Sequence, residues 1–431
     1  MNSPEQHQIS ETEIQNDKQI HKGYKTICVP CTCEVYKEVS TSFSEFRPYI
    51  DDVLGQFPDL FPQEIESGYF YKDSRESSKA GIRIYRIELK QNGEAYSLRP
   101  SFIMPYMTGL AKDVEHALFF RKFSVPFWAL THVFGRDPMY WYRIERALGR
   151  NSLVGTTVRS SENLPKNVLA DEKHTRDNGE KVYVATTVGD GCILGAAIAE
   201  TAGEEDLTKA YSTFHDEAKD IDPNYAPDTV NTDGWKPTQK AWKTLFPLID
   251  IIICFLHAFL KIRDRAKKKH HDQFMDVSEK VWNVYHAPDK KSFSQRMRRL
   301  KEWTLNNVVP DIIKEKVLDL CDKRSLFAKA YDHPKSHRTS NMLDRLMRMM
   351  DRHLFNMQYF HGNITSAETS MRANALIFNF CPSCPQTIKK HDGKISPAER
   401  LNGFRYHDNW LQNLLLSASL AGWRSVPQNP L

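Results

Sequence analysis

The chain has 431 residues, enough for two or three domains, and its 40% hydrophobic and 26% charged residues are those of an ordinary soluble protein. Its net charge of +5 is too small for total charge alone to predict a nucleic-acid partner. The longest apolar run, residues 245–260, is interrupted by Asp250 and His257 and is too polar to span a bilayer. Eight cysteines without the spacing of a small secreted protein favour a reduced, cytoplasmic protein.

The N-terminal part predicts a short lead followed by a mixed domain. Residues 1–22 are polar and lack the apolar core of a signal peptide, so we expect a disordered lead. Residues 23–160 are predicted to form an N-terminal DNA-binding domain. Within it, alternating residues 82–89 and 95–99 flank Gln91-Asn92-Gly93, which predicts a β-hairpin.

Three helices are expected next, at residues 114–123, 126–134 and 139–148. The turn Gly135-Arg136-Asp137-Pro138 precedes a basic helix, which is the arrangement of a helix-turn-helix. An ordinary helical hairpin with solvated arginines fits the same pattern equally well. The candidate DNA-binding residues here are Arg143, Arg146 and Arg150. Local density and helical spacing favour burial of four aromatic residues: Trp128, Phe134, Tyr140 and Trp141.

Residues 161–380 predict a mixed α/β catalytic domain, followed by a C-terminal tail at residues 381–431. The expected elements are, in order, strands at 168–172, 181–188 and 192–199, a helix at 204–219, a strand at 229–232, a helix at 236–246 and a strand at 248–255. This is the element order of a ribonuclease-H-like core, whose sheet gathers ligands at strand ends. A charged helical stretch, about 265–330, predicts an all-α insertion.

Three acidic residues are candidates for metal-dependent phosphodiester chemistry. Asp171 and Asp233 end strand-like apolar runs, and the first and fourth strands of a ribonuclease-H-like sheet are neighbours. Asp344 opens a helix for which Asn341 is the expected N-cap, and Glu368 is a rival third acid. Carboxylates that converge in this way can hold two Mg²⁺ or Mn²⁺ ions. Each acid also has a plain structural interpretation, as a strand end, a turn residue or a helix cap.

Two basic blocks, residues 261–269 and 296–299, fit either phosphate contacts or solvated helix faces. The candidate DNA-binding residues in them are Lys267, Lys268, Lys269, Arg298 and Arg299.

The cysteines offer weak signals for zinc. Cys254 and His257 form a Cys-x-x-His pair at an expected strand-to-helix junction, but a zinc site needs two further ligands. Two other groups could each be half of a structural zinc site, namely Cys28, Cys31 and Cys33 with His21, and Cys381 with Cys384. The alternating run at residues 27–35 also suits a strand with buried thiols, which we favour over zinc.

Several of these motifs, taken in order, resemble the Mutator-like branch of the DDE transposases, which includes many bacterial insertion-sequence enzymes. The resemblance covers residues 164–380. The matching motifs are Asp171, Thr232-Asp233-Gly234-Trp235, Phe246-Pro247, Cys254-Phe255-Leu256-His257, Thr339-Ser340-Asn341-Met342-Leu343-Asp344-Arg345, His361-Gly362 and Asn379-Phe380. The family's last acid is usually Glu, whereas this chain has Asp344, which is one methylene shorter.

The resemblance implies a transposase that cuts at the terminal inverted repeats of its element and joins the freed 3′-hydroxyl to target DNA. Asp171, Asp233 and Asp344 would hold two metal ions, and Cys254 and His257 would position the site. It also implies a homodimer or larger assembly that acts on double-stranded DNA and is nucleoid-associated when bound. Two alternatives remain: a non-catalytic DNA-binding regulator derived from a transposase, and a ribonuclease-H-like nuclease that does not join DNA.

Overall fold

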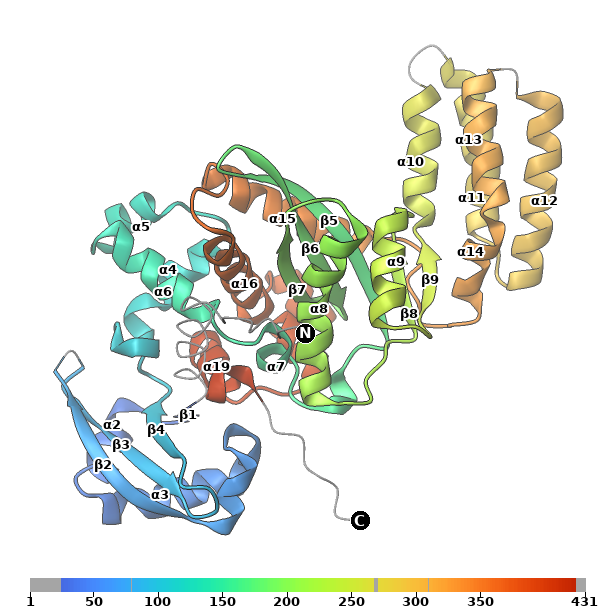
Figure 1. Cartoon of the computed structure of the whole chain (residues 1–431). Coiled ribbons are helices and arrows are strands. Elements are labelled where there is room, and N and C mark those ends of the chain that lie inside the picture. The colour runs from blue at the N-terminus through green and yellow to red at the C-terminus, as the bar shows by residue number, and fades with distance from the viewer. Residues whose placement is uncertain (1–24, 79, 267–269, 309, 424–431) are drawn as a thin grey trace, which may run out of the picture. The chain divides into compact units, whose positions relative to one another are not determined.

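The computed structural model describes residues 25–78, 80–266, 270–308 and 310–423 (Figure 1). The predicted lead at residues 1–22 and the candidates Lys267, Lys268 and Lys269 lie outside these ranges. Contacts divide the chain into two compact units. The first comprises residues 1–164, 216–224 and 363–431, and the second comprises residues 165–215 and 225–362. None of the described helices is both long and apolar enough to cross a membrane.

The first unit contains a four-stranded sheet in the order β1-β4-β3-β2. Its strands are β1 (Thr26–Val29), β2 (Tyr69–Ser77), β3 (Ile82–Leu89) and β4 (Ala95–Pro100). The β3–β4 pair is antiparallel, which confirms the predicted hairpin, while β1 is parallel to β4. The helices that follow β1 are α2 (Cys33–Val39) and α3 (Phe43–Gln56).

The expected strand at residues 27–35 is therefore wrong beyond Val29. Pro30 has no N–H to donate to a ladder, and the hydroxyl of Thr32 accepts a hydrogen bond from the N–H of Val35. Thr32 is thereby the N-cap of α2, so the local sequence begins a helix at Cys33 in place of a longer strand.

Three helices of the first unit match the predicted ones closely: α4 (Ala111–Arg121), α5 (Phe127–Phe134) and α6 (Pro138–Leu148). A buried ion pair between Arg121 and Glu145 joins α4 to α6. Trp141 is buried as predicted, and Phe134 and Tyr140 are half-buried. Burial of Trp128 is wrong, because 69% of this residue is exposed on α5.

The rest of the first unit is helical and tightly packed. Its helices are α7 (Leu153–Thr157), α16 (Ile364–Phe380), α17 (Pro385–Lys390), α18 (Pro397–Asn402) and α19 (Trp410–Ser417). Glu217 is buried and accepts hydrogen bonds from the hydroxyl of Ser152 and the N–H of Val154, and it pairs with Arg372. The backbones of Gly155 and Gly422 approach so closely that a Cβ at Gly155 would meet a carbonyl oxygen.

The second unit is built on a five-stranded sheet in the order β7-β6-β5-β8-β9. Strand β6 is antiparallel to both β5 and β7, and β8 and β9 continue the sheet parallel to β5. The predicted element order is confirmed, although β5 is longer than expected and β9 is shorter. The bounds are β5 (Asn167–Asp177), β6 (Glu180–Gly189), β7 (Cys192–Ala199), α8 (Glu204–Ile221), β8 (Thr229–Thr232), α9 (Lys236–Leu245) and β9 (Asp250–Ile253).

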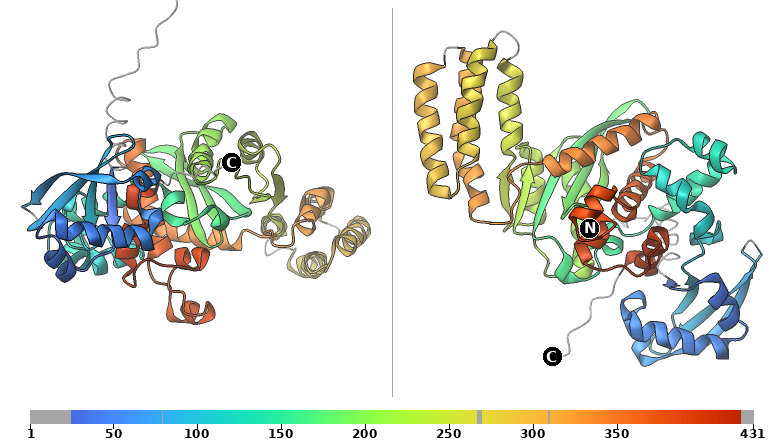
Figure 2. Two further views of the ribbon diagram at one scale, coloured as in Figure 1. Left: turned by 90° about the horizontal axis from the view of Figure 1, so that it is seen from below. Right: turned by 180° about the vertical axis from the view of Figure 1, so that it is seen from behind.

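Helices cover both faces of this sheet. Glu172 on β5 accepts hydrogen bonds from Tyr211 on α8 and Thr238 on α9, so these helices lie on the Glu172 face. Alternate strand residues point to opposite faces. On the other face, Lys173 pairs with Asp351 of α15 (Asn341–Asn356). The sheet is therefore sandwiched between α8 and α9 on one side and α15 on the other (Figures 1 and 2).

A helical bundle lies between β9 and α15 in the chain (Figures 1 and 2). It has its own hydrophobic core, to which Phe259, Val281, Leu300 and Val317 contribute. The stretch predicted to be an all-α insertion is thus helical, and its helices begin directly after β9. They are α10 (Phe255–Ala266), α11 (His271–Tyr285), α12 (Lys290–Asn307), α13 (Asp311–Asp322) and α14 (Arg324–Ala328).

Candidate active site

Asp171 and Asp233 lie at the same level on neighbouring parallel strands. Every residue pair in the β5–β8 register is 62 residues apart, from Asn167 with Thr229 to Leu169 with Asn231. Asp171 and Asp233 have the same separation, so the register carried forward by two residues places them side by side. The expectation that Asp171 ends its strand is wrong, because β5 continues to Asp177 through pairing with β6. Asp233 does follow the last residue of β8.

Cys254 occupies the next position across the sheet. The β8–β9 register pairs Thr232 with Ile253, and one further residue brings Cys254 beside Asp233. The N–H of Cys254 donates to the carbonyl of Thr232 at 2.7 Å, which extends the ladder to this point. His257 lies in the first turn of α10, directly after the strand. The expected strand-to-helix junction at Cys254-x-x-His257 is confirmed.

Asp171, Asp233 and Cys254 thus form a row across three neighbouring strands. Ser340 connects the third acid, Asp344, to this row. Its hydroxyl oxygen lies 3.2 Å from Cys254 Sγ, 3.3 Å from His257 Nδ1 and 3.2 Å from Asp344 Oδ1. Its N–H also donates to Cys254 Sγ at 3.2 Å. Asp344 is thereby held in the first turn of α15, and the Ser340 side chain links it to the junction of β9 and α10.

The N-cap of α15 is Ser340, so the expectation of Asn341 at that position is wrong. The carbonyl of Ser340 accepts the N–H of Asp344 at 2.8 Å, and the helical hydrogen bonds therefore begin one residue earlier than expected.

The charges in this row influence one another. Burial raises the pKa of Asp171 to about 6, and the negative charges of Asp233 and Asp344 add to the shift, while the Glu172 N–H and His257 oppose it. A hydrogen bond with Cys254 raises the pKa of His257 to about 9, helped by Asp344 and Asp171. Burial alone would raise the pKa of the Cys254 thiol, but hydrogen bonds from His257 and Ser340 outweigh it and lower that pKa.

Each of the three carboxylates has one oxygen engaged by the protein. Asp171 accepts the N–H of Glu172 at 2.9 Å, Asp233 accepts the N–H of Trp235 at 2.8 Å, and Asp344 is held by Ser340. Their other oxygens have no hydrogen-bond partner among the described residues. Hard anionic oxygens are the ligands that a divalent cation such as Mg²⁺ prefers, and a cation would relieve the repulsion between neighbouring carboxylates.

Within the described ranges, no three or more His, Cys, Asp or Glu side chains are already drawn together as a metal-binding group.

Glu172 is a half-buried acid that the sequence pattern did not single out. It follows Asp171 and so points to the opposite face of β5, where the hydroxyls of Tyr211 and Thr238 each donate to its Oε1 at 2.7 Å. Burial raises its pKa to about 7, although these two hydrogen bonds oppose the shift. Strand alternation next to a candidate metal ligand is the signal that could have identified it.

The other described candidate residues lie on elements that do not carry this row. Glu368 is on α16, in the first unit. On α6, Arg143 is exposed and Arg146 donates to the Tyr142 hydroxyl at 3.3 Å. The Arg150 guanidinium lies 4.9 Å from the centre of the Tyr106 ring. Arg298 and Arg299 are exposed on α12.

The cysteines outside the row are free thiols. Cys28, Cys31 and Cys381 are buried, Cys33 is half-buried and Cys384 is exposed, while His21 lies outside the described residues. Burial raises the pKa of Cys28 and of Cys31, the latter to about 11, which favours protonated thiols over metal-binding thiolates.

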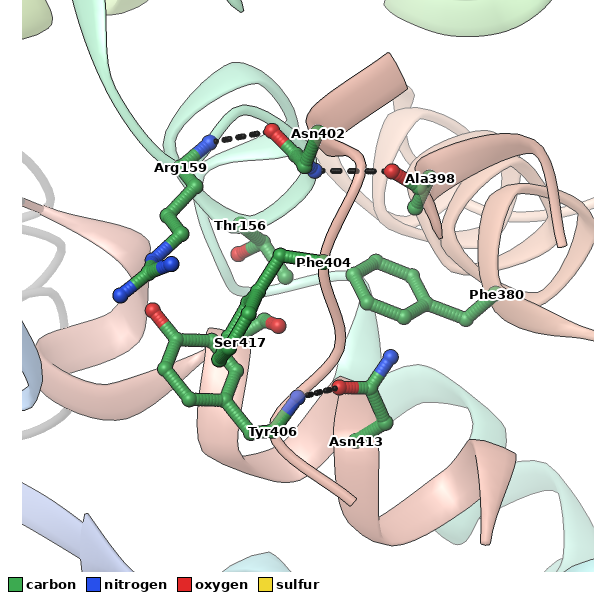
Figure 3. Close-up of a pocket in the computed structure, with 9 residues that line it drawn as sticks. All are labelled: Thr156, Arg159, Phe380, Ala398, Asn402, Phe404, Tyr406, Asn413 and Ser417. Carbon is green, nitrogen blue, oxygen red and sulfur yellow. Dashed lines mark hydrogen bonds between the residues drawn. The ribbon is translucent and has the colours of Figure 1, made fainter. Parts of the chain in front are cut away.

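A small cavity in the first unit is already filled by the protein's own groups (Figure 3). The Arg159 guanidinium lies 3.8 Å from the centre of the Phe404 ring and donates to Asp59, and the backbone N–H of Arg159 donates to the side-chain oxygen of Asn402. Tyr406 completes this aromatic and polar cluster through its hydrogen bond with Asp59. Because the cation of Arg159 occupies the aromatic groove, we interpret the cavity as structural.

Comparison of the sequence with models of known protein families found no match, and no curated protein matches it.

Proposed function

We propose that the protein is a DDE-type DNA transposase with a ribonuclease-H-like core. The observation that carries this proposal is that Asp171, Asp233 and Asp344, which are far apart in the chain, lie on elements that adjoin at one edge of the sheet, where the charges of Asp233 and Asp344 act on Asp171. Two of them are level on adjacent parallel strands, and the third is tied to the same sheet edge through Ser340. Unrelated strand ends or helix caps would not need to lie on adjoining elements.

The topology supports the same proposal. Numbered within the second unit, the strand order is 3-2-1-4-5, with the first and fourth strands adjacent. The helical bundle separates the second acid from the third, which is where the resembling transposases have their insertion. The acid-bearing elements β5, β8 and α15 are also the ones expected for a ribonuclease-H-like nuclease or transferase.

In the proposed reaction, Asp171, Asp233 and Asp344 would hold two Mg²⁺ or Mn²⁺ ions, which supply activation of the attacking oxygen and stabilisation of the leaving oxygen. Water attacks a phosphodiester at the element end, breaking the P–O3′ bond and releasing a 3′-hydroxyl. That hydroxyl then attacks a phosphodiester of target DNA, forming one P–O bond as another breaks. His257, Cys254 and Ser340 fix the carboxylate of Asp344 during these steps.

The test is a strand-transfer assay on DNA that flanks the coding region, with Mg²⁺ or Mn²⁺ present. Wild-type protein should nick the end and join it to a target duplex. Asp171→Asn and Asp233→Asn preserve side-chain size but remove charge, and each should slow both steps by roughly 10²-fold or more while DNA binding persists. Joined products support a transposase, whereas nicks alone would indicate a nuclease and binding alone a regulator.

Two further variants check the assignment of the third acid. Asp344→Asn should match the loss seen for Asp171→Asn, and Glu368→Gln should leave transfer near the wild-type rate. Asp276→Asn, an exposed acid on α11, is the matched surface control. Near-normal cleavage by Asp171→Asn or Asp233→Asn would contradict the proposal.

A further inference from the structure

A cleft in the second unit begins at Asp233 and extends between α10 and α13. Its first stretch is lined by Asp233, Gly234, Ala258, Lys261, Lys316 and Lys323. A second stretch shares Lys261 and Lys316 and adds Arg265. The cleft therefore joins one of the candidate metal ligands to a series of cationic side chains on the helical bundle.

Helical periodicity places these cations on the cleft side of each helix. Lys261 and Arg265 are one turn apart on α10, and Lys316 and Lys323 are two turns apart along α13 and its C-cap. The faces next to these cations are apolar, with Ile262 and Val317 fully buried in the bundle core. Because that core fixes the rotation of both helices, the basic faces stay directed into the cleft.

The acids that also line the cleft already have cationic partners. Asp319 pairs with Lys323 at 2.8 Å, and Asp264 pairs with Arg263 at 3.0 Å. In contrast, Lys261 forms no ion pair within the part of the chain that the structure describes. Among the described residues, Lys316 pairs only with its exposed neighbour Glu315, and a pair of this kind stabilises little. The lining cations Lys261, Arg265, Lys316 and Lys323 outnumber the lining acids Asp233, Asp264 and Asp319, so the cleft retains positive charge for another anion.

Small residues keep the start of the cleft open next to Asp233. Gly234 has φ of +96°, and a Cβ there would lie 3.3 Å from Ile253 Cγ2. Ala258 contributes only a methyl group on the facing side of α10. From Phe255 at the base of α10, Lys261 is about 9 Å along the helix and Arg265 about 6 Å further, so the cations form a row that leads away from the acids.

We propose that this cleft binds the sugar-phosphate backbone of the DNA strand that continues from the phosphate under attack, with Lys261 and Lys316 as the principal phosphate contacts. This inference rests on the proposed function and adds the path of the substrate to it. A chain of phosphates matches a row of ammonium groups that starts at the acids, whereas a single small anion would need only one of them. The contacts would position DNA without reading its sequence.

The experiment compares two double variants of the full chain. Lys261→Gln with Lys316→Gln removes both cleft charges, and Lys280→Gln with Lys291→Gln removes two exposed lysines elsewhere on the same bundle. Binding to a labelled duplex of arbitrary sequence is measured by fluorescence anisotropy over a range of salt concentrations. The cleft variant should bind roughly tenfold more weakly at low salt, and the slope of log K against log salt should become shallower by about 1.4–1.8.

Strand transfer by the same proteins separates the two proposals. The cleft variant should transfer strands more slowly than wild type, while the control variant should match wild type in both assays. Equal behaviour of the cleft variant and wild type, or equal losses in both double variants, would overturn the inference even if wild-type transfer is intact. Wild-type protein that binds DNA through the cleft but never cuts it would instead count against the proposed function alone. Thermal melting checks that all variants are folded.

Discussion

At the scale of single residues, Ser340 joins three parts of the candidate site through one hydroxyl. With its pKa raised, His257 is protonated near neutral pH and has an N–H on both ring nitrogens. It can then donate to Ser340, whose own O–H donates to Asp344. Because the Ser340 hydroxyl donates to Asp344, the group of Ser340 that donates to Cys254 Sγ is its backbone N–H. The chain of hydrogen bonds directs the Asp344 carboxylate toward the row that contains Asp171 and Asp233.

Ser340→Ala should therefore affect metal use as well as stability. Loss of a buried hydrogen-bonding group should cost about 1–2 kcal/mol of unfolding free energy, and DNA cleavage should slow roughly tenfold because Asp344 is no longer held. The measurement is the cleavage rate as a function of Mg²⁺ concentration, in which the variant should need more metal. Ser340→Thr keeps the hydroxyl and should restore the wild-type metal dependence. A loss of stability with unchanged metal dependence would mean that Ser340 is only structural.

The acids of the site could be predicted from the local sequence, but the residue that holds Asp344 in place, Ser340, could not. Asp171, Asp233 and Asp344 stand out because each follows an apolar run or opens a helix. Nothing in the local sequence marks Ser340 as the residue that links them, because the link depends on contacts across the fold. The N-cap at Ser340 was missed for a related reason: Asn341 is an equally good capping residue, and only the backbone geometry decides between them.

At the scale of elements, β5 carries two consecutive acids that point to opposite faces of the sheet. Asp171 faces the candidate metal site, and Glu172 faces α8 and α9. Both carboxyl groups have raised pKa values, mainly through burial. A raised pKa in the folded state means that a group stabilises the fold at low pH and that this contribution is lost as pH rises through the folded value.

Metal-free protein should accordingly lose stability as pH rises from about 4.5 through about 7, the range between the ordinary and raised pKa values of Glu172. Glu172→Gln keeps an acceptor oxygen for Tyr211 and Thr238 but cannot ionise. At about pH 8 this variant should be more stable than wild type by on the order of 1–2 kcal/mol, and the difference should shrink toward about pH 4.5. Urea unfolding in chelator at several pH values measures it.

Glu279→Gln, an exposed substitution on α11, is the control for this comparison and should track wild type at every pH. A Glu172→Gln variant that is less stable than wild type at about pH 8 would show that the ionised carboxylate is favourable where it lies.

The elements themselves were largely predictable, because periodicity and turn residues report local structure. The hairpin β3–β4, the order of strands and helices from β5 to β9, and the helices of the bundle all follow from such patterns. Element ends were less predictable. The β5 strand continues to Asp177 through polar residues because β6 pairs with it along that length, and cross-strand pairing is invisible to an apolar-run criterion.

At the scale of the whole molecule, the site depends on segments that are distant in the chain but meet at one sheet edge. The cleft beside Asp233 could not be predicted from the basic blocks. Lys316 and Lys323 lie outside both blocks, and Arg298 and Arg299 do not line it. Only the packing of α10 against α13 brings the cleft cations together, since these helices are separated in the chain by two others.

A cation held by acids from β5, β8 and α15 would couple these elements, so metal binding should stabilise the folded protein as a whole. Any ligand that binds only the folded state raises stability, by about 1.4 kcal/mol at ten times its Kd. Mg²⁺ or Mn²⁺ should therefore raise the melting temperature of wild-type protein relative to chelator at matched ionic strength. Asp171→Asn and Asp233→Asn should lose this increase, because each removes a ligand.

The same two variants should melt at a higher temperature than wild type in chelator at about pH 8, because each relieves repulsion between half-buried carboxylates. This reversal of order between chelator and metal distinguishes a metal site from a general loss of folding. Scanning calorimetry of the three proteins with and without metal measures it, with Asp276→Asn as the exposed control. An equal response to Mg²⁺ in wild type and both site variants would place the metal elsewhere and remove the support for Asp171 and Asp233 as ligands.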